Sequence, residues 1–358
     1  MEEEVAESTW HQEPIELFEI ASWEELHRGV RDASASVIDF SVGPNDGRVY
    51  CLFRHSLAAE EEPPRYYYAV AVLDVDWEAR RYLGKQVYEL GDDYRTEYNW
   101  IRVLGDDFLL VGRWSDYNGG KPERNGLLVG RDGTAKRDYC FGSSIDACLV
   151  MADGTIVMGY DDTESFADAH GLDLDHPYFS LDGIVAFRPD GTQFWNSGKH
   201  GYAFLHMCTA LSQDVQGCMW AFYKTWRCDP ELDRDRKLYD YLEEWEWNTD
   251  EITDSCELAK TDFQGECEIF LRCSNKITLS SGFAVAPSQR KMLFRGGVFH
   301  ESGFFLVTRK GNAWVAEAGV VPQLNGQPFS RKERWWCQFT DYRTLWMGSE
   351  GLYGYRFV

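Results

Sequence analysis

The chain has 358 residues, of which 44% are hydrophobic and 15% aromatic, and its formal net charge is −23. This composition can supply a large core and argues against disorder over most of the chain. Its large charge clusters are acidic, whereas nucleic acids and anionic membranes are bound by clustered Lys and Arg, so both are disfavoured as partners.

The chain begins with an acidic stretch, residues 1–14, that we expect to be a tail outside the folded domain. Its first residues have neither the basic nor the apolar region of a secretory signal, and no segment has 18 consecutive apolar residues. We therefore expect a cytoplasmic protein with reduced cysteines. The ten cysteines include no CxxC pair, and those in apolar runs, such as Cys148, are expected to be buried; no cofactor is predicted.

A strand, a tight polar turn and a second apolar strand recur six times along the chain. The six turns centre near Gly47, Asp106, Gly154, Gly217, Arg290 and Arg343. Their spacing suits four-stranded blades, which run about 40 to 50 residues, with variable loops. The sequence thus predicts a single all-β domain over residues 15–358, a six-bladed β-propeller.

The last repeat ends after three strands, at GLYGYRFV, while the apolar, alternating residues 15–22 have no partner upstream of the first repeat. We expect residues 15–22 to supply the outer strand of the last blade and so close the ring, which leaves no unpaired edge there.

One repeat contains the run DGIVAFRPDGTQFW. Through Ala186, Asp190, Gly191, Thr192 and Trp195 it resembles single blades of quinoprotein-type and related bacterial propellers, and the whole chain resembles uncharacterised bacterial propellers. The resemblance implies the fold. It covers about one blade, and the Trp does not recur in the other repeats, so it implies no quinone cofactor.

Long insertions fall between the second and third strands of four successive repeats, at residues 55–65, 115–125, 161–182 and 226–256. In a propeller these connections all emerge on one face, so the insertions should converge there. The fourth is predicted to contain a short helix, because Leu238, Tyr241, Leu242 and Trp245 follow helical spacing.

The negative charge is concentrated in three segments. Residues 1–20, 159–182 and 226–257 have net charges of −7, −7 and −8, and so hold −22 of the total of −23. The carboxylates and aromatic side chains of the two long insertions are the residues predicted to contact a partner: Asp161, Asp162, Glu164, Asp168, Asp173, Asp175, Tyr239, Glu243, Glu244, Trp245 and Trp247. Aromatic anchors surrounded by charge are typical of protein interfaces. The same stripe of the helix could instead pack on the propeller.

Most local signatures of catalysis are absent: the sequence has no GxSxG, HExxH or Gly-rich phosphate loop. The alternative to a binding protein is a metal-dependent propeller hydrolase or lactonase with a cation in the channel, for which the candidate ligands are Glu97, Asn99, Asp146 and His206. We predict no catalytic residues and no metal in the favoured interpretation. It is a non-enzymatic propeller that binds a basic protein, for example a toxin domain neutralised by its immunity protein; a scaffold or ligand-sensing propeller is a third reading.

Overall fold

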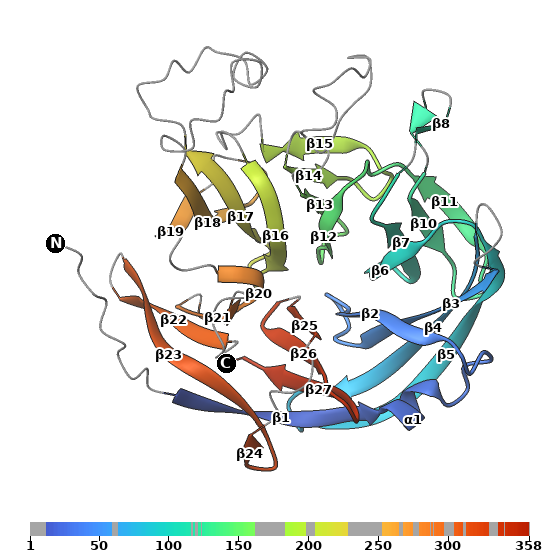
Figure 1. Cartoon of the computed structure of the whole chain (residues 1–358), viewed down its shortest axis with the longest axis horizontal. Helices are drawn as coiled ribbons and strands as arrows, with labels where there is room; N and C mark the ends of the chain where they lie inside the picture. The colour runs from blue at the N-terminus through green and yellow to red at the C-terminus, as the bar shows by residue number, and fades with distance from the viewer. Residues whose placement is uncertain are drawn as a thin grey trace.

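The computed structural model describes residues 12–58, 64–115, 117–118, 121–122, 124–161, 183–197, 205–227, 253–264, 268–274, 279–286, 288, 290–296, 304–310, 313–328, 336–339 and 341–357. Successive groups of antiparallel strands form blades that follow one another around a ring (Figure 1). The fold is a six-bladed β-propeller, as the repeats predict.

The first three blades are separate four-stranded sheets. Blade 1 consists of β2 (Ser36–Val42), β3 (Val49–Ala58), β4 (Arg65–Asp76) and β5 (Arg81–Tyr94). Blade 2 consists of β6 (Tyr98–Leu104), β7 (Asp107–Gly112), β10 (Gly126–Val129) and β11 (Ala135–Tyr139), with the small hairpin β8 (Tyr117–Asn118) and β9 (Lys121–Pro122) between β7 and β10. Blade 3 consists of β12 (Ile145–Val150), β13 (Ile156–Tyr160), β14 (Ile184–Phe187) and β15 (Gln193–Asn196).

The last three blades include the strands from both ends of the chain. Blade 4 consists of β16 (Leu205–Gln213), β17 (Met219–Arg227), β18 (Thr253–Thr261) and β19 (Glu268–Ser274). Blade 5 consists of β20 (Leu279–Val285), β21 (Lys291–Gly296), β22 (Phe304–Lys310) and β23 (Ala313–Leu324), with β24 (Gln327–Pro328) paired to the end of β23. Blade 6 consists of β25 (Trp336–Phe339), β26 (Arg343–Met347), β27 (Gly351–Arg356) and β1 (Gln12–Ser22).

Strand β1 closes the ring. Its second half, from Phe18 to Ser22, pairs antiparallel with β27, which confirms the prediction that the N-terminal segment supplies the outer strand of the last blade. The first half, from Gln12 to Leu17, pairs in parallel with β23 of blade 5, which the sequence does not predict. One strand therefore joins blades 5 and 6 into a continuous sheet, and it begins three residues before the predicted start at residue 15.

The core lies between the blades rather than inside any one of them. Six clusters of buried hydrophobic residues lie in the described part of the chain, one at each junction of neighbouring blades. Successive side chains of β3 point to opposite faces of the sheet, so one strand contributes to two clusters. Cys51 and Phe53 pack toward blade 6, whereas Tyr50 and Leu52 pack toward blade 2. Because both faces of a middle strand are covered, such strands read as apolar at every position, as β13 does with all five residues buried.

The turn between the first two strands of each blade lies where the sequence places it. Blade 3 shows the local chemistry: the Asp153 carboxylate accepts a hydrogen bond from the Thr155 backbone N–H at 2.9 Å, and Gly154 has φ +87°. The same Asp-Gly-Thr turn recurs between β14 and β15, in the run that resembles other propellers, where Trp195 is buried. A short Asp side chain that caps the turn, followed by a residue free to adopt positive φ, explains the recurrence.

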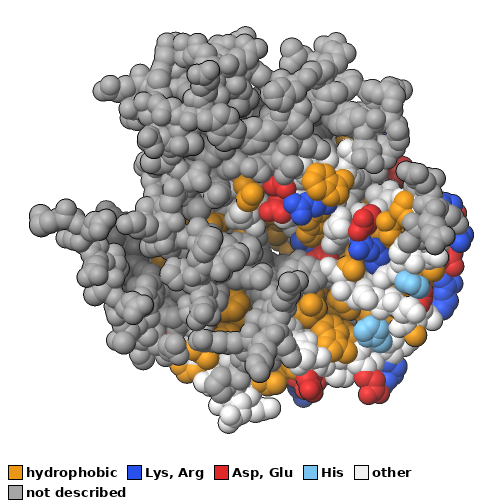
Figure 2. All heavy atoms as spheres, in the orientation of Figure 1, with side chains coloured by type: hydrophobic (Ala, Val, Ile, Leu, Met, Phe, Trp, Pro, Cys, Tyr) orange, Lys and Arg blue, Asp and Glu red, His pale blue; other side chains and the backbone are white. Residues whose placement is uncertain are grey.

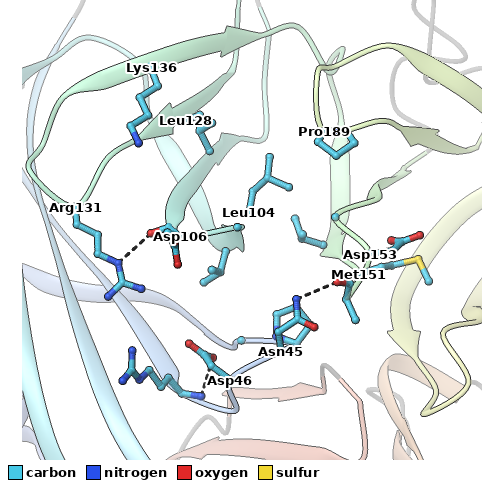
Figure 3. Close-up of a pocket in the computed structure, with 18 of the residues that line it drawn as sticks. Asn45, Asp46, Leu104, Asp106, Leu128, Arg131, Lys136, Met151, Asp153 and Pro189 are labelled. Atoms are coloured by element: carbon cyan, nitrogen blue, oxygen red, sulfur yellow. Dashed lines mark hydrogen bonds between the residues drawn. The ribbon is translucent and has the colours of Figure 1, made fainter.

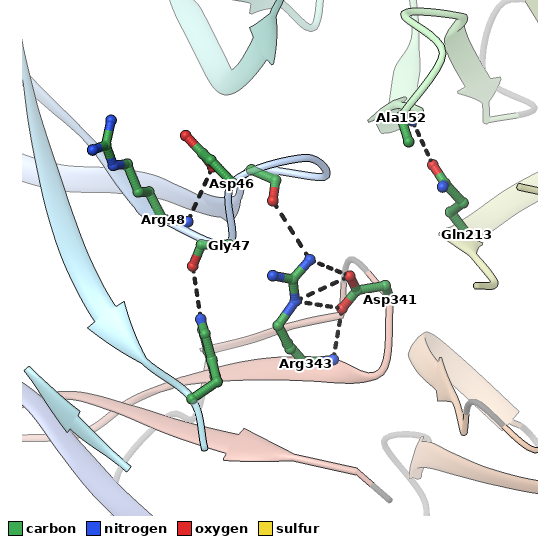
Figure 4. A network of polar contacts seen from close by, with 9 residues as sticks. Asp46, Gly47, Arg48, Ala152, Gln213, Asp341 and Arg343 are labelled. Atoms are coloured by element: carbon green, nitrogen blue, oxygen red, sulfur yellow. Dashed lines mark hydrogen bonds and ion pairs between the residues drawn. The ribbon is translucent and has the colours of Figure 1, made fainter. Parts of the chain in front are cut away.

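These turns also contact one another across blades (Figure 4). The Gln213 side chain of blade 4 accepts a hydrogen bond from the Ala152 N–H of blade 3 at 2.8 Å. Arg343 of blade 6 pairs with Asp341 and donates to the Gly43 carbonyl oxygen of blade 1. The ring is thus fastened at its turn face as well as at β1.

A buried ion pair links the inner strands of blades 1 to 3. Arg102 on β6 donates through Nη1 to the Asp39 carboxylate on β2 at 2.8 Å, and through Nε to the Cys148 carbonyl oxygen on β12 at 2.7 Å. The side chain of Asp39 is fully buried, and it also accepts from the Ile101 N–H. The Asp39 carboxylate and two nitrogens of the Arg102 guanidinium therefore have partners inside the fold.

The described helix α1 (Trp23–His27) lies between β1 and β2, where the sequence predicted none. Ser22 caps it by accepting a hydrogen bond from the Glu25 N–H at 3.2 Å, and two glutamates occupy its first turn, both favourable at a helix N-terminus. The helix predicted within residues 226–256 lies outside the described residues. Neither α1 nor any other helix of the described ranges has the length and apolar character needed to cross a membrane.

Candidate functional site

The insertions leave the blades on one face of the ring. In blade 3 the base of the third insertion is closed by the Tyr160 N–H, which donates to the Gly183 carbonyl oxygen at 2.9 Å. In blade 4 the strands flanking the fourth insertion pair as far as Arg227 with Thr253. Both connections join the second and third strands of neighbouring blades, so they start from the same side of the propeller, which we call the insertion face. Figure 2 shows side chains of both signs of charge and hydrophobic side chains near the centre of this face.

Arg113, directly after β7, organises the described part of the insertion face. Its guanidinium Nη2 lies 2.7 Å from Asp161 Oδ2 and 3.5 Å from Asp146 Oδ1. Its backbone N–H donates to Asn99 Oδ1 at 2.8 Å. The guanidinium also lies 5.3 Å from the ring of Trp114, whose side chain is half exposed. Blades 2 and 3 are thereby joined at their rim by one cation.

Three predicted site residues meet at Arg113, although the sequence assigns them to two different sites. Asn99 and Asp146 are candidate metal ligands, whereas Asp161 is a candidate partner contact. Asp161 is 5% exposed, and its backbone N–H donates to the Ser144 carbonyl oxygen, so it anchors the base of the third insertion instead of standing out from it. Arg113 itself is missed by sequence reasoning, because its partners lie up to 48 residues away along the chain.

The other two candidate metal ligands do not join this group in the described structure. Glu97 is exposed and forms an ion pair with Arg54 of blade 1 at 2.6 Å. His206 lies on β16, and its side chain is outside the described residues. Within the ranges that the structure describes, no three His, Cys, Asp or Glu side chains are grouped as metal ligands.

Ten of the predicted partner contacts lie outside the described residues. They are Asp162, Glu164, Asp168, Asp173, Asp175, Tyr239, Glu243, Glu244, Trp245 and Trp247. Their contact with a partner stays a prediction, which rests on their place in the two insertions.

A second polar group lies on blade 1, beside α1. His55 at the end of β3 bonds through Nδ1 to Asp32 Oδ2 at 2.7 Å. This bond, helped by one from the Ser34 N–H, holds the pKa of Asp32 below its usual value. Nearby, Glu89 accepts from the Tyr67 hydroxyl at 2.7 Å and from the Arg31 N–H at 2.9 Å. These carboxylates are engaged by donors of the chain itself.

Comparison with known proteins shows no family for this chain. No protein-family model and no curated protein matches the chain. Solved structures with a similar arrangement include a gluconolactonase from Xanthomonas campestris (13% identity, 71% of this chain and 80% of that one, TM-score 0.35) and the β-propeller domain of the Trilobed protease from Pyrococcus furiosus (10%, 90% and 82%, TM-score 0.38). Another is the hydrazine synthase of Kuenenia stuttgartiensis (10%, 78% and 78%, TM-score 0.40). Likenesses this distant do not transfer an activity.

Proposed function

We propose that this propeller is a non-enzymatic binding protein, whose third and fourth insertions present carboxylates and aromatic side chains to a basic protein. The observation that carries the proposal is the common origin of the two insertions. The strands β13 and β14, and β17 and β18, open on the same side of adjacent blades. Two segments with net charges of −7 and −8 are therefore rooted next to each other.

The ion pairs on the insertion face are consistent with the insertions being the source of the negative charge. Asp146 and Asp161 share the cation of Arg113, and Glu97 pairs with Arg54, so each of these carboxylates already has a cationic partner on the rim. Outside the three acidic segments the chain has a net charge of −1. The negative field of the protein should thus come from the insertions and the first residues. Such a field accelerates encounter with a basic partner and is weakened by salt.

Arg113 also favours binding over the metal-dependent alternative. A guanidinium within 3.5 Å of Asp146 supplies the positive charge that a bound cation would otherwise bring. We expect calcium, manganese and zinc each to leave the melting temperature unchanged, because a ligand that binds the folded state raises it. A metal-dependent rise that disappears in Asp146→Asn would favour the hydrolase instead.

The test of the proposal is reversal of charge on the insertions. We expect the combined change of Asp162, Glu164, Glu243 and Glu244 to Lys to weaken capture of a partner from the native host by roughly tenfold or more. Asp161 is left unchanged, because its buried ion pair with Arg113 would make the variant unstable for another reason. Capture by the wild type should also fall as salt is raised.

A matched variant distinguishes the effect of the insertions from the effect of net charge alone. Glu24, Asp93, Asp138 and Glu350 are exposed carboxylates outside the insertions, and changing all four to Lys alters the charge by the same amount. This control should retain the partner. If the insertion variant retains it as well, the proposal is wrong.

The immunity form of the proposal has its own requirement. The captured protein should be a basic toxin whose activity is blocked by the wild type and not by the insertion variant. A partner without such activity would leave the binding function in place and remove the immunity role.

A further inference from the structure

The face opposite the insertions has a cavity between blades 1, 2 and 3, with a volume of about 1310 Å³ (Figure 3). It is formed by the turns that join the first and second strands, together with those that join the third and fourth. Blade 1 contributes Asn45 and Asp46, blade 2 Asp106 and Arg131, and blade 3 the turn at Asp153. This volume exceeds the range of about 300 to 1,000 Å³ usual for sites that bind small molecules, so space does not limit a ligand.

Two arginines from different blades extend into this cavity. Arg48 is fixed through Nε, which donates to Asp74 Oδ1 at 2.6 Å. Arg131 is fixed through Nε, which donates to the Asp106 carbonyl oxygen at 2.9 Å, and through Nη1, which donates to the Tyr88 hydroxyl at 3.2 Å. The Arg131 guanidinium also lies 5.6 Å from the centre of the Tyr88 ring. Each guanidinium group is thus held by hydrogen bonds on its Nε side. Its remaining Nη atoms point away from these bonds.

The charges of the two arginines act on the same neighbour, Tyr50. Burial raises the pKa of the Tyr50 hydroxyl, as does its hydrogen bond to Asp46, while the charges of Arg131 and Arg48 act in the opposite direction. Both guanidinium groups therefore lie within electrostatic reach of one hydroxyl at the boundary of blades 1 and 2. Two cations that line one cavity both favour an anion bound there.

Four of the five aspartates at the cavity wall accept hydrogen bonds from the chain itself, whereas three arginine nitrogens donate none within the described residues. Asp46 accepts from the Arg48 N–H and the Tyr50 hydroxyl, Asp153 from the Thr155 N–H, and Asp190 from the Thr192 N–H. By contrast, both Nη atoms of Arg48 and Nη2 of Arg131 have no hydrogen-bond partner among the residues that the structure describes. Among the described residues, the free hydrogen-bonding groups of the cavity therefore include these guanidinium donors, together with the carboxylate of Asp106.

We propose that this cavity is a second binding site, which takes a small molecule bearing a phosphate or carboxylate between Arg48 and Arg131. The planar guanidinium fork matches the oxygens of either group. The uncharged body of the ligand would lie against the apolar part of the wall, formed by Leu104, Leu128 and Met151. Because the wall also carries Asp46, Asp74 and Asp106, directed hydrogen bonds to one oxyanion, rather than a surplus of positive charge, give the selectivity.

The test uses defined probes on the full chain. Glucose 6-phosphate, gluconate and inorganic phosphate are titrated by calorimetry, with glucose as the uncharged control. We expect at least one of the anions to bind and glucose not to bind. Tighter binding of glucose 6-phosphate would identify phosphate as the recognised group, and tighter binding of gluconate would identify carboxylate.

Variants tie the binding to the two arginines. Arg131→Gln and Arg48→Gln should each lower the affinity for the anion by about tenfold or more, because each removes a charged donor. Arg131→Lys should lose most of the affinity as well, since a lysine lacks the fork. The control is Arg81→Gln, on an exposed arginine whose ion pair with Asp76, at 3.7 Å, is long and outside the cavity.

Two results would overturn the site. One is the absence of binding by all three anions at millimolar concentration. The other is unchanged binding in Arg131→Gln, a variant whose melting temperature shows that it remains folded. Neither result bears on the insertion face, which lies on the other side of the ring.

Discussion

Arg113 shows how one side chain determines what its neighbours do. Asn99, Asp146 and Asp161 look from the sequence like three independent polar residues, each available to a ligand. In the structure each of them contacts Arg113, through either its guanidinium or its backbone N–H. The roles of such residues depend on a contact that brings distant parts of the chain together, and local sequence does not contain it.

We expect Arg113→Ala to lower the free energy of unfolding by about 2 kcal/mol. The change removes the hydrogen bond that the guanidinium donates to the buried carboxylate of Asp161, and a hydrogen bond to a charged group contributes about 1.5 to 3 kcal/mol. Urea denaturation measures the loss.

The control for this change is Arg124→Ala in the same blade. Arg124 and Asp138 are 3.6 Å apart, and both side chains are more than half exposed, so the loss should be below about 1 kcal/mol. An equal loss of unfolding free energy in the two variants would mean that the ion pair of Arg113 with Asp161 stabilises the fold no more than an exposed pair does.

At the scale of the strand, β1 depends on a close approach to β27. Gly351 pairs with Ser22, and a Cβ at Gly351 would lie 2.3 Å from the carbonyl oxygen of Ala21 and 2.8 Å from the Cα of Ser22. Both atoms belong to the backbone, which cannot move aside as a side chain can. Glycine is thus required here by the neighbouring strand and not by a turn.

Gly351→Ala should therefore destabilise the protein by about 1 to 3 kcal/mol, the usual cost of overpacking. Gly84→Ala on β5 is the matched change, since a Cβ there would meet nothing within 4 Å. In a strand interior that alanine should be neutral or stabilising by up to about 1 kcal/mol. Thermal unfolding of the two variants gives the comparison, and a tolerated Gly351→Ala would show that β1 can shift away from β27.

Most of the ring is predictable because its turns and strands are specified by residues that are close together in the sequence. The turns at Gly47, Gly154 and Gly217 are local, and strands beside them are apolar at nearly every position, as expected of a sheet covered on both faces. The closing strand could be inferred because the last repeat lacked one. The parallel pairing of Gln12 with Gly319 could not be inferred, because parallel strands are joined through distant parts of the chain and carry no local turn signal.

The insertion face is less predictable than the ring, and for a physical reason. Charge counting locates the acidic segments but not the counter-charges that fold against them, as the burial of Asp161 shows. The cavity on the opposite face has no sequence motif either, since Arg48 and Arg131 come from turns of different blades.

For the whole molecule, the pair of Asp39 and Arg102 makes stability depend on pH. Burial raises the pKa of Asp39 to about 6, against the lowering effect of Arg102. A folded-state pKa above the unfolded value of 3.8 means that the folded protein binds the proton more tightly. The stabilisation from this group is therefore fully present below pH 3.8 and is lost as the pH rises through about 6.

Comparison with Asp39→Asn isolates this contribution, because all other titrating groups are shared. Between about pH 4 and pH 7, the free energy of unfolding of the wild type should fall relative to that of the variant. Parallel curves for the two proteins would show that Asp39 does not titrate in this range.

The shared strand β1 determines how the ring would respond to tension. Phe18 faces Gly354 and Ser22 faces Gly351, so the middle of β1 and the end of β27 lie at the same end of their ladder. A load that pulled residues before β1 away from residues after β27 would act first on the pairs of Gln12 to Leu17 with β23, and would then unzip the ladder with β27 one pair at a time. The strand that seals the propeller is, under mechanical load, the first place at which it would open.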